Sequence, residues 1–382
     1  MKYNLADICE YAKGKVDVTI LSDDTYISTE NMIPNKGGIT SASSLPAIAQ
    51  TQAFLAGDVL VSNIRPYFKK IWFAEYDGGC SNDVLVFRAK NGVNKRFLYY
   101  VLADDTFFDY SMATSKGTKM PRGDKVAIMK YEVPAFSYEE QGKIAGILEA
   151  LDREIQLNAE INKNLEQQAQ AYFNELFVVN AVPTWSECTL SDIGTIVAGG
   201  TPSKSKPVYY AKQGIAWITP KDLAVDKSKF ISRGANDISE LGFSKSSATK
   251  MPAGTVLFSS RAPIGYIAIA QNEVTTNQGF KSVVPNENIG TAYVYFLLKN
   301  LLPTIEGMAS GSTFKEISGT GMKSVPTIMP DMSTIQRFNI FCEPIFKEQE
   351  VLEAENHRLS ILRDSLLPKL MSGELDISDI DL

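Results

Sequence analysis

Residues 137–177 constrain this chain more than any other stretch, because they contain no proline and carry a long seven-residue repeat. Ser137 and Glu140 predict an S-x-x-E capping box at the start of a helix. Apolar and asparagine residues then alternate at spacings of four and three, a period typical of a coiled-coil seam: Ile144, Leu148, Leu151, Ile155, Asn158, Asn162, Leu165, Ala169, Tyr172 and Leu176. At about 1.5 Å per residue the helix would be roughly 55 Å long, which indicates a spacer.

The same pattern occurs again near the C-terminus. Pro330, Ser333 and Gln336 repeat the proline, the serine cap and the box. The seam that follows includes one charged position, Arg363, and otherwise consists of Phe338, Cys342, Ile345, Gln349, Leu352, Asn356, Leu359, Leu366 and Leu370. Pro344 predicts a kink or disrupted first turns. If the two seams pack together, the helices run antiparallel, and the asparagines fix the register; in the alternative reading, the asparagines are solvated on a less regular helix.

The segments that precede the two helices also repeat. Residues 1–137 and 184–332 share an order of short strands, turns and one helix, at offsets between 185 and 197. In both, a buried strand leads to an arginine, Arg65 or Arg261, with a proline one or two residues later. A polar loop lies further on, at residues 115–118 and 310–313. The repeat predicts an α+β tandem duplication, in which a β-rich module precedes each long helix (138–183 and 333–382). Two antiparallel helices would make it a dumbbell with pseudo-twofold symmetry.

Charge is divided unevenly along the chain. The net charge of −6 hides modules of +1 and +3 and helical segments of −5 each. The helices are therefore poor ligands for nucleic acid, whereas the modules carry a mild positive excess. No signal peptide, membrane span or CxxC pair is present in the printed sequence, and a cytoplasmic chain without a metal site is expected.

The residues do not favour catalysis. The single histidine, His357, is expected to be a solvated helix residue, so neither module has a base for a Ser-His or Cys-His pair. No phosphate-binding loop or dinucleotide fingerprint occurs, and residues 199–203 (Gly-Gly-Thr-Pro-Ser) have the wrong spacing for one. Asp104 and Asp105 indicate a solvated helix face rather than an acid–base pair.

The modules instead offer basic and amide side chains of the kinds that contact phosphates and base edges. Taken singly, each is an ordinary surface residue. Arg65 and Arg261 rank first because each follows the corresponding strand of its module. The full set of candidates is Arg65, Lys69, Lys70, Asn82, Lys116, Lys119 and Arg122 in the first module, and Ser203, Lys204, Lys206, Lys221, Arg261, Gln278, Lys281 and Lys315 in the second.

Five motifs together resemble the DNA-specificity subunit of type I restriction–modification systems. They are residues 199–203, residues 215–222 (Ile-Ala-Trp-Ile-Thr-Pro-Lys-Asp), residues 276–279 (Thr-Asn-Gln-Gly), the repeated helix start with a proline and then a glutamine (Gln141 and Gln336), and residues 366–374 (Leu-Leu-Pro-Lys-Leu-Met-Ser-Gly-Glu). The resemblance covers essentially the whole chain. The first module departs from it, because it lacks counterparts of the first two motifs.

The resemblance implies two target-recognition domains that read the two halves of a bipartite double-stranded DNA site. The two helices would act as a ruler and as a docking surface for two methyltransferase subunits, which nuclease–translocase subunits would join. Catalysis and S-adenosylmethionine would belong to those partners, and this chain would need no cofactor. The coiled-coil and partner interface is expected to comprise the seam residues Ile144, Leu148, Leu151, Ile155, Asn162, Leu165, Ile345, Leu352, Asn356, Leu359 and Leu366.

Three alternatives stay open from the sequence. An autonomous enzyme would show methyltransferase or nuclease activity in the isolated chain. A coiled-coil scaffold would bind no DNA even as a complete complex. A recognition subunit of a related defence system would copurify with a different catalytic partner.

Overall fold

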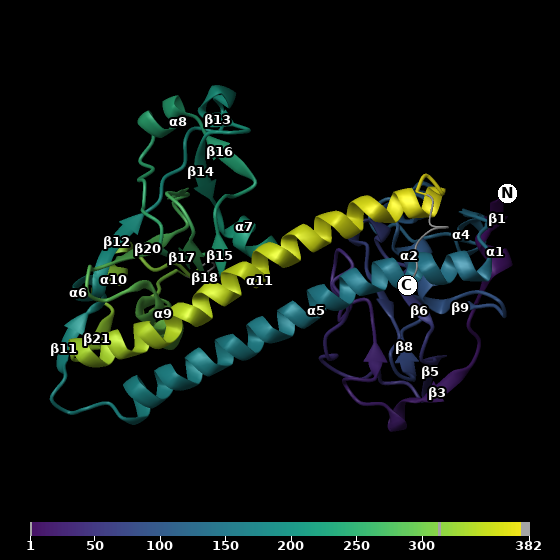
Figure 1. The fold of residues 1–382 in the computed structure, drawn as a ribbon, viewed down its shortest axis with the longest axis horizontal. Coiled ribbons are helices and arrows are strands. Elements are labelled where there is room, and N and C mark those ends of the chain that lie inside the picture. The colour runs from purple at the N-terminus through teal and green to yellow at the C-terminus, as the bar shows by residue number, and fades with distance from the viewer. Residues whose placement is uncertain (1, 312–314, 376–382) are drawn as a thin grey trace. The chain divides into compact units, whose positions relative to one another are not determined.

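The computed structural model describes residues 2–311 and 315–375 (Figure 1). The contacts within the chain divide it into two units: unit 1 is Met1–Gln156 with His357–Leu382, and unit 2 is Leu157–Asn356. Each unit therefore consists of one module and parts of both long helices. In the described part of the chain, no helix combines the length and the apolar character that crossing a membrane requires.

The first long helix, α5 (Tyr138–Asn174), begins at the predicted capping box. The Ser137 amide donates to Glu140 Oε2 at 2.6 Å, and the Glu140 amide donates to Ser137 Oγ at 3.2 Å. A π-helical turn, Glu175–Val179, ends the helix. The Ser137 and Glu140 assignments are therefore confirmed.

The second long helix, α11 (Met332–Ser372), corrects the expected cap and the expected disruption of the first turns. Its cap is Asp331 and not Ser333, because Asp331 Oδ1 accepts from the Thr334 amide at 2.9 Å and from the Ser333 hydroxyl at 2.5 Å. Bonds from Ser333 and Thr334 lower the pKa of Asp331. The helix also continues through Pro344. The carbonyl that Pro344 leaves without a backbone donor belongs to Ile340, which is 70% exposed and open to water.

Unit 1 contains three antiparallel or mixed sheets. The first pairs β1 (Lys2–Asn4) with β10 (Glu132–Pro134). The second has the order β2 (Cys9–Tyr11), β9 (Val84–Ala89), β6 (Val59–Ser62), β7 (Ile71–Phe73), and the third the order β3 (Lys15–Asp17), β5 (Gln50–Phe54), β8 (Gly78–Cys80), β4 (Tyr26–Ile27). The helices are α1 (Leu5–Ile8), α2 (Lys95–Ala103), α3 (Asp105–Ala113) and α4 (Lys125–Ile128).

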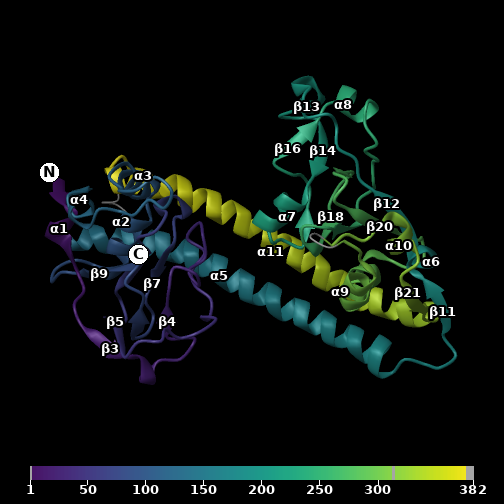
Figure 2. The ribbon, with the colours of Figure 1, turned by 180° about the vertical axis from the view of Figure 1, so that it is seen from behind.

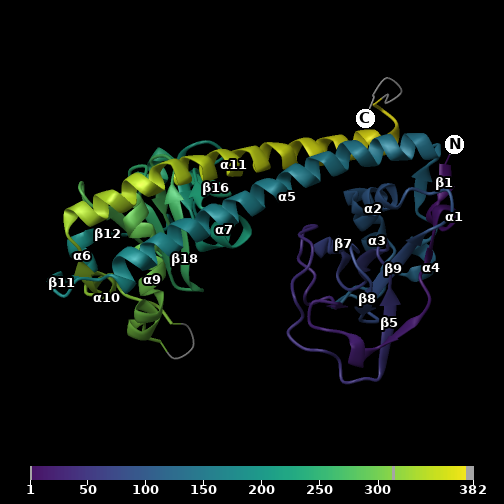
Figure 3. The ribbon, with the colours of Figure 1, turned by 60° about the horizontal axis from the view of Figure 1, so that its bottom comes forward.

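The core of unit 1 joins the second sheet to the long helices through α2. Phe97, Leu98 and Val101 of α2 are buried in one cluster with Ile144 and Leu148 of α5. The end of α11 adds Leu367, Leu370 and Met371 to the same cluster. Figure 3 shows α2 under the first turns of α5, with β5 and β8 at the far side of the module.

Unit 2 repeats this organisation. Its first sheet pairs β11 (Ser186–Thr189) with β21 (Pro326–Met329). The second has the order β12 (Gly194–Ala198), β20 (Lys281–Pro285), β17 (Val256–Ser260), β18 (Ile264–Ala270), β15 (Phe230–Ile231), and the third the order β13 (Tyr210–Ala211), β16 (Asn236–Ile238), β14 (Ile215–Ile218), β19 (Thr275–Thr276). The helices are α6 (Leu190–Ile193), α7 (Pro220–Val225), α8 (Glu240–Ser244), α9 (Thr291–Met308) and α10 (Gly319–Lys323).

The two modules share the second sheet but differ in the third. Strands β2, β9, β6 and β7 correspond in chain order and pairing to β12, β20, β17 and β18. In the third sheet of module one, β8 lies between β5 and β4. In module two, β19 lies at the edge of the sheet and pairs in parallel with β14, so that Thr275 is opposite Trp217. In Figure 2 the strands β13, β14 and β16 lie at the end of module two away from α11. The duplication therefore preserves the part of each module nearest the helices.

No predicted seam residue is exposed in either long helix. In unit 2, Asn158 Nδ2 donates to Glu355 Oε2 at 3.2 Å, Gln349 Nε2 donates to the Asn162 carbonyl at 3.0 Å, and Tyr172 packs against Phe338. In unit 1, Arg363 Nη1 donates to Asp152 Oδ1 at 2.8 Å.

One buried lysine attaches module two to both long helices. Lys229 precedes β15 and is 7% exposed. Its ammonium forms an ion pair with Glu166 of α5 and donates to Gln349 Oε1 of α11 at 2.6 Å. Burial lowers the pKa of Lys229, and the charge of Glu166 opposes that shift. Lys299 of α9 also donates to Glu166, at 2.5 Å.

We expect Lys229→Met to lower the free energy of unfolding by about 2–4 kcal/mol. Gln349 loses its hydrogen-bond donor, and the charge of Glu166 is then balanced, among the described residues, by Lys299 alone. Lys227→Met is the matched control, since Lys227 is exposed two residues earlier and lies over the Tyr266 ring. Urea unfolding of both variants measures the difference. Equal losses in the two variants would show that the buried ion pair contributes nothing specific.

Candidate nucleic-acid interface

The first candidate surface begins where the buried strand β6 ends. Arg65 follows this strand with a left-handed backbone (φ 52°), and the 3-10 turn Pro66–Phe68 comes next. A residue before proline is restricted to few conformations, and a left-handed one costs roughly 1–2 kcal/mol for a residue with a Cβ. The Arg65 amide nevertheless donates to the Pro121 carbonyl at 2.8 Å, which ties the turn to a second loop.

Three loops meet here and form what we call the first basic surface: residues 34–38, 64–70 and 115–122. The Asn35 and Lys36 amides donate to the carbonyls of Phe68 and Lys69, both at 2.8 Å. Lys116 and Arg122 exchange backbone bonds across a hairpin, at 2.9 and 3.0 Å. Asn35, Lys36, Arg65 and Lys69 all have positive φ, at 57°, 62°, 52° and 50°. Strained backbone of this kind persists only where its surroundings over-determine it, and it gathers at functional sites.

Carboxylates hold several of the cations in place. Lys36 and Lys69 both pair with Asp105, at 2.9 and 2.7 Å. Burial opposes ionisation of Asp105, but the hydrogen bonds from the two lysines outweigh it and lower its pKa. In the hairpin, Lys116 pairs with Asp124 at 2.6 Å.

Arg122 and Arg65 complete this charged set. Arg122 pairs with Asp83 at 3.2 Å. Within the described residues, Nε of Arg65 is buried and has no hydrogen-bond partner. Most of the predicted residues of the first module therefore lie on one surface.

Two predicted lysines behave differently from each other. Lys70 is half-buried, its ammonium donates to the Thr29 carbonyl at 2.5 Å, and burial lowers its pKa. Lys70 is therefore less available to contact DNA than its predicted position on a loop indicated. Lys119 is exposed at the tip of the hairpin and makes no ion pair within residues 2–311 and 315–375.

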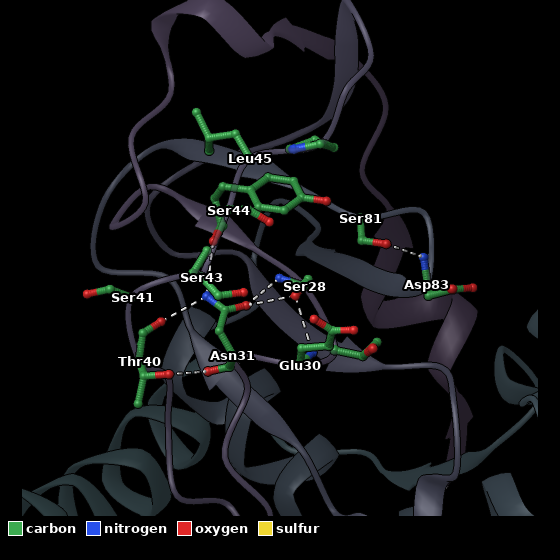
Figure 4. Close-up of a pocket in the computed structure, with 14 residues that line it drawn as sticks. Ser28, Glu30, Asn31, Thr40, Ser41, Ser43, Ser44, Leu45, Ser81 and Asp83 are labelled. Atoms are coloured by element: carbon green, nitrogen blue, oxygen red, sulfur yellow. Dashed lines mark hydrogen bonds between the residues drawn. The ribbon is translucent and has the colours of Figure 1, made fainter.

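A polar hollow of about 460 Å³ adjoins the first basic surface (Figure 4). Residues 28–31 and 40–46 line it, together with Ser81 and Asp83. The buried Asn31 side chain organises it, because it accepts from the Ser28 amide at 2.6 Å and donates to the Thr40 carbonyl at 2.8 Å. Lys70 and Asp83 join this hollow to the basic surface. Hydroxyl and carboxylate groups of this kind can hydrogen-bond to base edges.

The second basic surface lies at the corresponding place in module two, after strand β17. It comprises residues 199–206, 261–264 and 276–281, with 310–311 and 315–316. Gly199 leaves no room for a side chain, because a Cβ there would lie 2.0 Å from the Asn277 carbonyl oxygen. Because the two backbones approach so closely, residues 199–203 pack against residues 276–279. Thr201 donates to Gln278 Oε1 there, and Trp217 Nε1 donates to the Gly200 carbonyl at 3.0 Å.

Arg261 repeats the arrangement of the first module. Its backbone bridges to Glu316, as Ile64 bridges to Arg122. The Arg261 guanidinium also donates to Glu316 Oε2 at 3.3 Å, and Ala262 has a positive φ of 53°. Residues 312–314, which include part of the predicted loop 310–313, lie outside the described residues.

Lys281 corrects the expectation of a loop ligand. It begins strand β20 and is 8% exposed, with its ammonium 3.7 Å from Glu316 Oε1. Burial lowers its pKa. Its charge therefore pairs with Glu316, which Arg261 also binds, and does not face solvent.

The remaining candidates are exposed. Lys206 lies over the Tyr209 ring at 5.4 Å, and Ser203 contacts Ser205. Lys221 is on α7 beside the 276–279 loop, because the parallel pairing of β14 and β19 places Ile218 against Thr276. Asn82, Lys204 and Lys315 also face solvent.

Sequence reasoning missed several members of the two surfaces. Lys36, Tyr67 and Phe68 belong to the first, and Thr201 and Glu316 to the second. The turn Asn-Lys-Gly-Gly at residues 35–38 was a signal for a special backbone, but its partners, Phe68 and Lys69, are distant in the sequence.

We expect Lys119→Gln to weaken binding to duplex DNA by a similar factor whatever the DNA sequence. The salt dependence of binding should fall by the amount of about one phosphate contact. Fluorescence anisotropy at several salt concentrations measures both. Lys163→Gln, which removes an exposed charge from α5, is the control and should change neither. A loss confined to one DNA sequence would contradict a phosphate contact.

Comparison with known proteins places this geometry in context. The sequence model described as "type I restriction modification DNA specificity domain" matches residues 1–167 and 183–351. The HindI specificity subunit of a type I restriction enzyme from Haemophilus influenzae is 25% identical, over 98% of this chain and 99% of that protein.

Two further relatives agree with these. The MjaIX specificity subunit from Methanocaldococcus jannaschii is 36% identical over 47% of this chain and 44% of its own length, so that this alignment spans less than half of the relative. A crystal structure of a type I restriction–modification S subunit from M. genitalium has a TM-score of 0.62 at 17% identity, over 97% of this chain and 96% of that one. That likeness concerns the fold.

Proposed function

Because the chain belongs to the type I restriction–modification DNA specificity family, we propose that it is the subunit that recognises DNA in such a complex. Each module reads one half of a bipartite, asymmetric double-stranded site. This chain supplies sequence recognition, and its partners supply methyl transfer, cleavage and S-adenosylmethionine.

The observation that carries this proposal is the repetition of one basic surface at one topological position. In both modules an arginine follows the central buried strand, and a bridge joins the turn to a polar loop. The positive φ falls on the arginine itself in module one (Arg65) and on the next residue in module two (Ala262). Two such surfaces in one chain suit two half-sites, because Arg and Lys position a protein on phosphates while neighbouring polar groups read bases.

The differences between the modules support an asymmetric site. The third sheets have different strand orders, and the groups around the two arginines are chemically different. Beside Arg65 lie lysines and a hollow with serines and carboxylates, whereas beside Arg261 lie Thr201 and Gln278. Each surface therefore presents its own set of donors and acceptors to the base edges.

We further propose that α5 and α11 pair as an antiparallel coiled coil that sets the spacing of the half-sites. The contacts within unit 2 support this, because the partners of Asn158, Asn162 and Tyr172 fall in the order Glu355, Gln349 and Phe338. The bond between Asp152 and Arg363 in unit 1 follows the same direction. Half-sites read on one face of DNA are about one helical turn, or roughly 34 Å, apart.

The outer faces of the long helices are proposed to dock two methyltransferase subunits, which nuclease–translocase subunits then join. These helices are acidic, which disfavours DNA, and they carry exposed apolar side chains that a protein interface would cover. The residues concerned are Leu157, Ile161, Ile340, Val351, Ile361 and Leu362, with exposures between 36% and 70%.

Genome-wide methylation mapping of the host, with and without this gene, tests the proposal most directly. Loss of methylation at one split, asymmetric motif is the expected result, and it yields the target sequence. If no motif changes, copurification decides between a silent system and a related defence system with another catalytic partner.

We expect exchange of residues 184–332 for the same segment of another family member to change one half of the methylated motif and leave the other half intact. The graft should keep Lys229 and Lys299, since these side chains attach the module to Glu166. A change in both halves would contradict independent reading by the two modules.

A further inference from the structure

An exposed aromatic pair projects from the first basic surface. Tyr67 and Phe68 are 48% and 37% exposed, and their ring centroids are 4.7 Å apart. They occupy the turn Pro66–Phe68, directly after Arg65. Single exposed apolar residues are common on proteins, but two adjacent aromatic rings on one tight turn are a larger and less soluble feature.

The turn that carries the pair is held rigidly. The residues on both sides of it, Arg65 and Lys69, have left-handed backbones. Its carbonyls accept bonds from Asn35 and Lys36, and Arg65 is bonded to Pro121. A side chain presented from such a frame loses little conformational entropy when it enters a ligand, so the pair is preorganised for binding.

The rings belong to a surface that is rich in cations. Lys70 Nζ lies 5.9 Å from the centre of the Phe68 ring, and Lys36, Arg65 and Lys69 belong to the neighbouring residues of the same surface. The only carboxylate paired with Lys36 and Lys69 in the described chain is Asp105. Aromatic rings among lysines and arginines match nucleic acid, in which stacked bases lie between two rows of phosphates.

Module two has no such pair at the corresponding place. After Pro263 it has Ile264, Gly265 and Tyr266, and these are half-buried. Lys227 covers the Tyr266 ring at 4.6 Å. The feature is therefore specific to one of the two modules.

We propose that Tyr67 and Phe68 are a wedge that enters a base step in the DNA half-site read by module one, unstacking or bending it, while the half-site read by module two stays stacked. This inference rests on the proposed DNA-recognition function. The half-site of module one would then be recognised partly through how easily its sequence deforms, as pyrimidine–purine steps do.

The test uses the full chain assembled with its methyltransferase subunits and a DNA fragment that carries the mapped motif. 2-Aminopurine is placed at each position of both half-sites in turn, because its fluorescence rises when the base is unstacked. Methyltransferases flip their target base, so a rise at the methylated base of either half-site is expected whatever the wedge does. Beyond those positions, we expect a further rise at one step in the half-site of module one and none in the other half-site. The exchange of module two identifies which half-site belongs to which module.

The double variant Tyr67→Ala/Phe68→Ala should abolish this rise and weaken binding to the cognate fragment by about 10- to 100-fold, the usual loss for a stacked aromatic side chain. The matched control is Ile20→Ala/Ile48→Ala, which removes two exposed apolar side chains (75% and 52%) from the same module outside the three loops. The control should leave both readouts unchanged.

Other outcomes would overturn the wedge. A wild-type complex that binds its site with no unstacking, and with unchanged affinity in the double variant, removes the wedge but leaves the recognition function intact. Loss of methyltransferase subunits from the double variant, measured by native mass spectrometry, would make the pair a protein interface instead. A wild-type complex that binds and methylates no DNA would contradict the recognition function itself.

Discussion

The attachment of each module to the two long helices is the constraint on which the rest of the structure depends. An isolated helix gains little stability in water from its own backbone, so α5 and α11 require an apolar partner along their seams. Buried aromatic and aliphatic residues of α2 and α9 supply it in the two units. Charged groups within these contacts fix their direction: Lys229 binds Glu166 in unit 2, and Asp152 binds Arg363 in unit 1.

The two basic surfaces follow from that frame. The second sheet, which is common to both modules, ends its buried central strand at the same place, and the following arginine is held by a bridge to a distant loop. Because the strand and the loop are both fixed, the turn between them tolerates left-handed residues that would be unfavourable in a free loop. The strain is thus located where cations must be presented in a defined geometry.

Divergence is greatest in the third sheets, which differ in strand order and in the hollow beside them. The second sheets share four strands, and they differ by the added strand β15 in module two and by the turn Pro66–Phe68, with its exposed rings, in module one. A duplicated protein can therefore present two unrelated sets of base-reading groups on one scaffold. Loops on a rigid sheet commonly carry specificity for this reason.

The sequence by itself determined the seam positions, the first capping box, the duplication and the place of Arg65 and Arg261, because these depend on periodicity and neighbouring residues. Sequence-based prediction failed where a residue contacts a partner that is distant in the chain, or where a neighbouring residue takes its role. Asp331 rather than Ser333 caps α11, Lys281 is buried against Glu316, and Lys36 meets Lys69 only through folding. The cap was decided by competition between neighbouring side chains. Tertiary structure alone decided the other two, since burial and ion pairing are set by which loops meet, and no local pattern encodes that meeting.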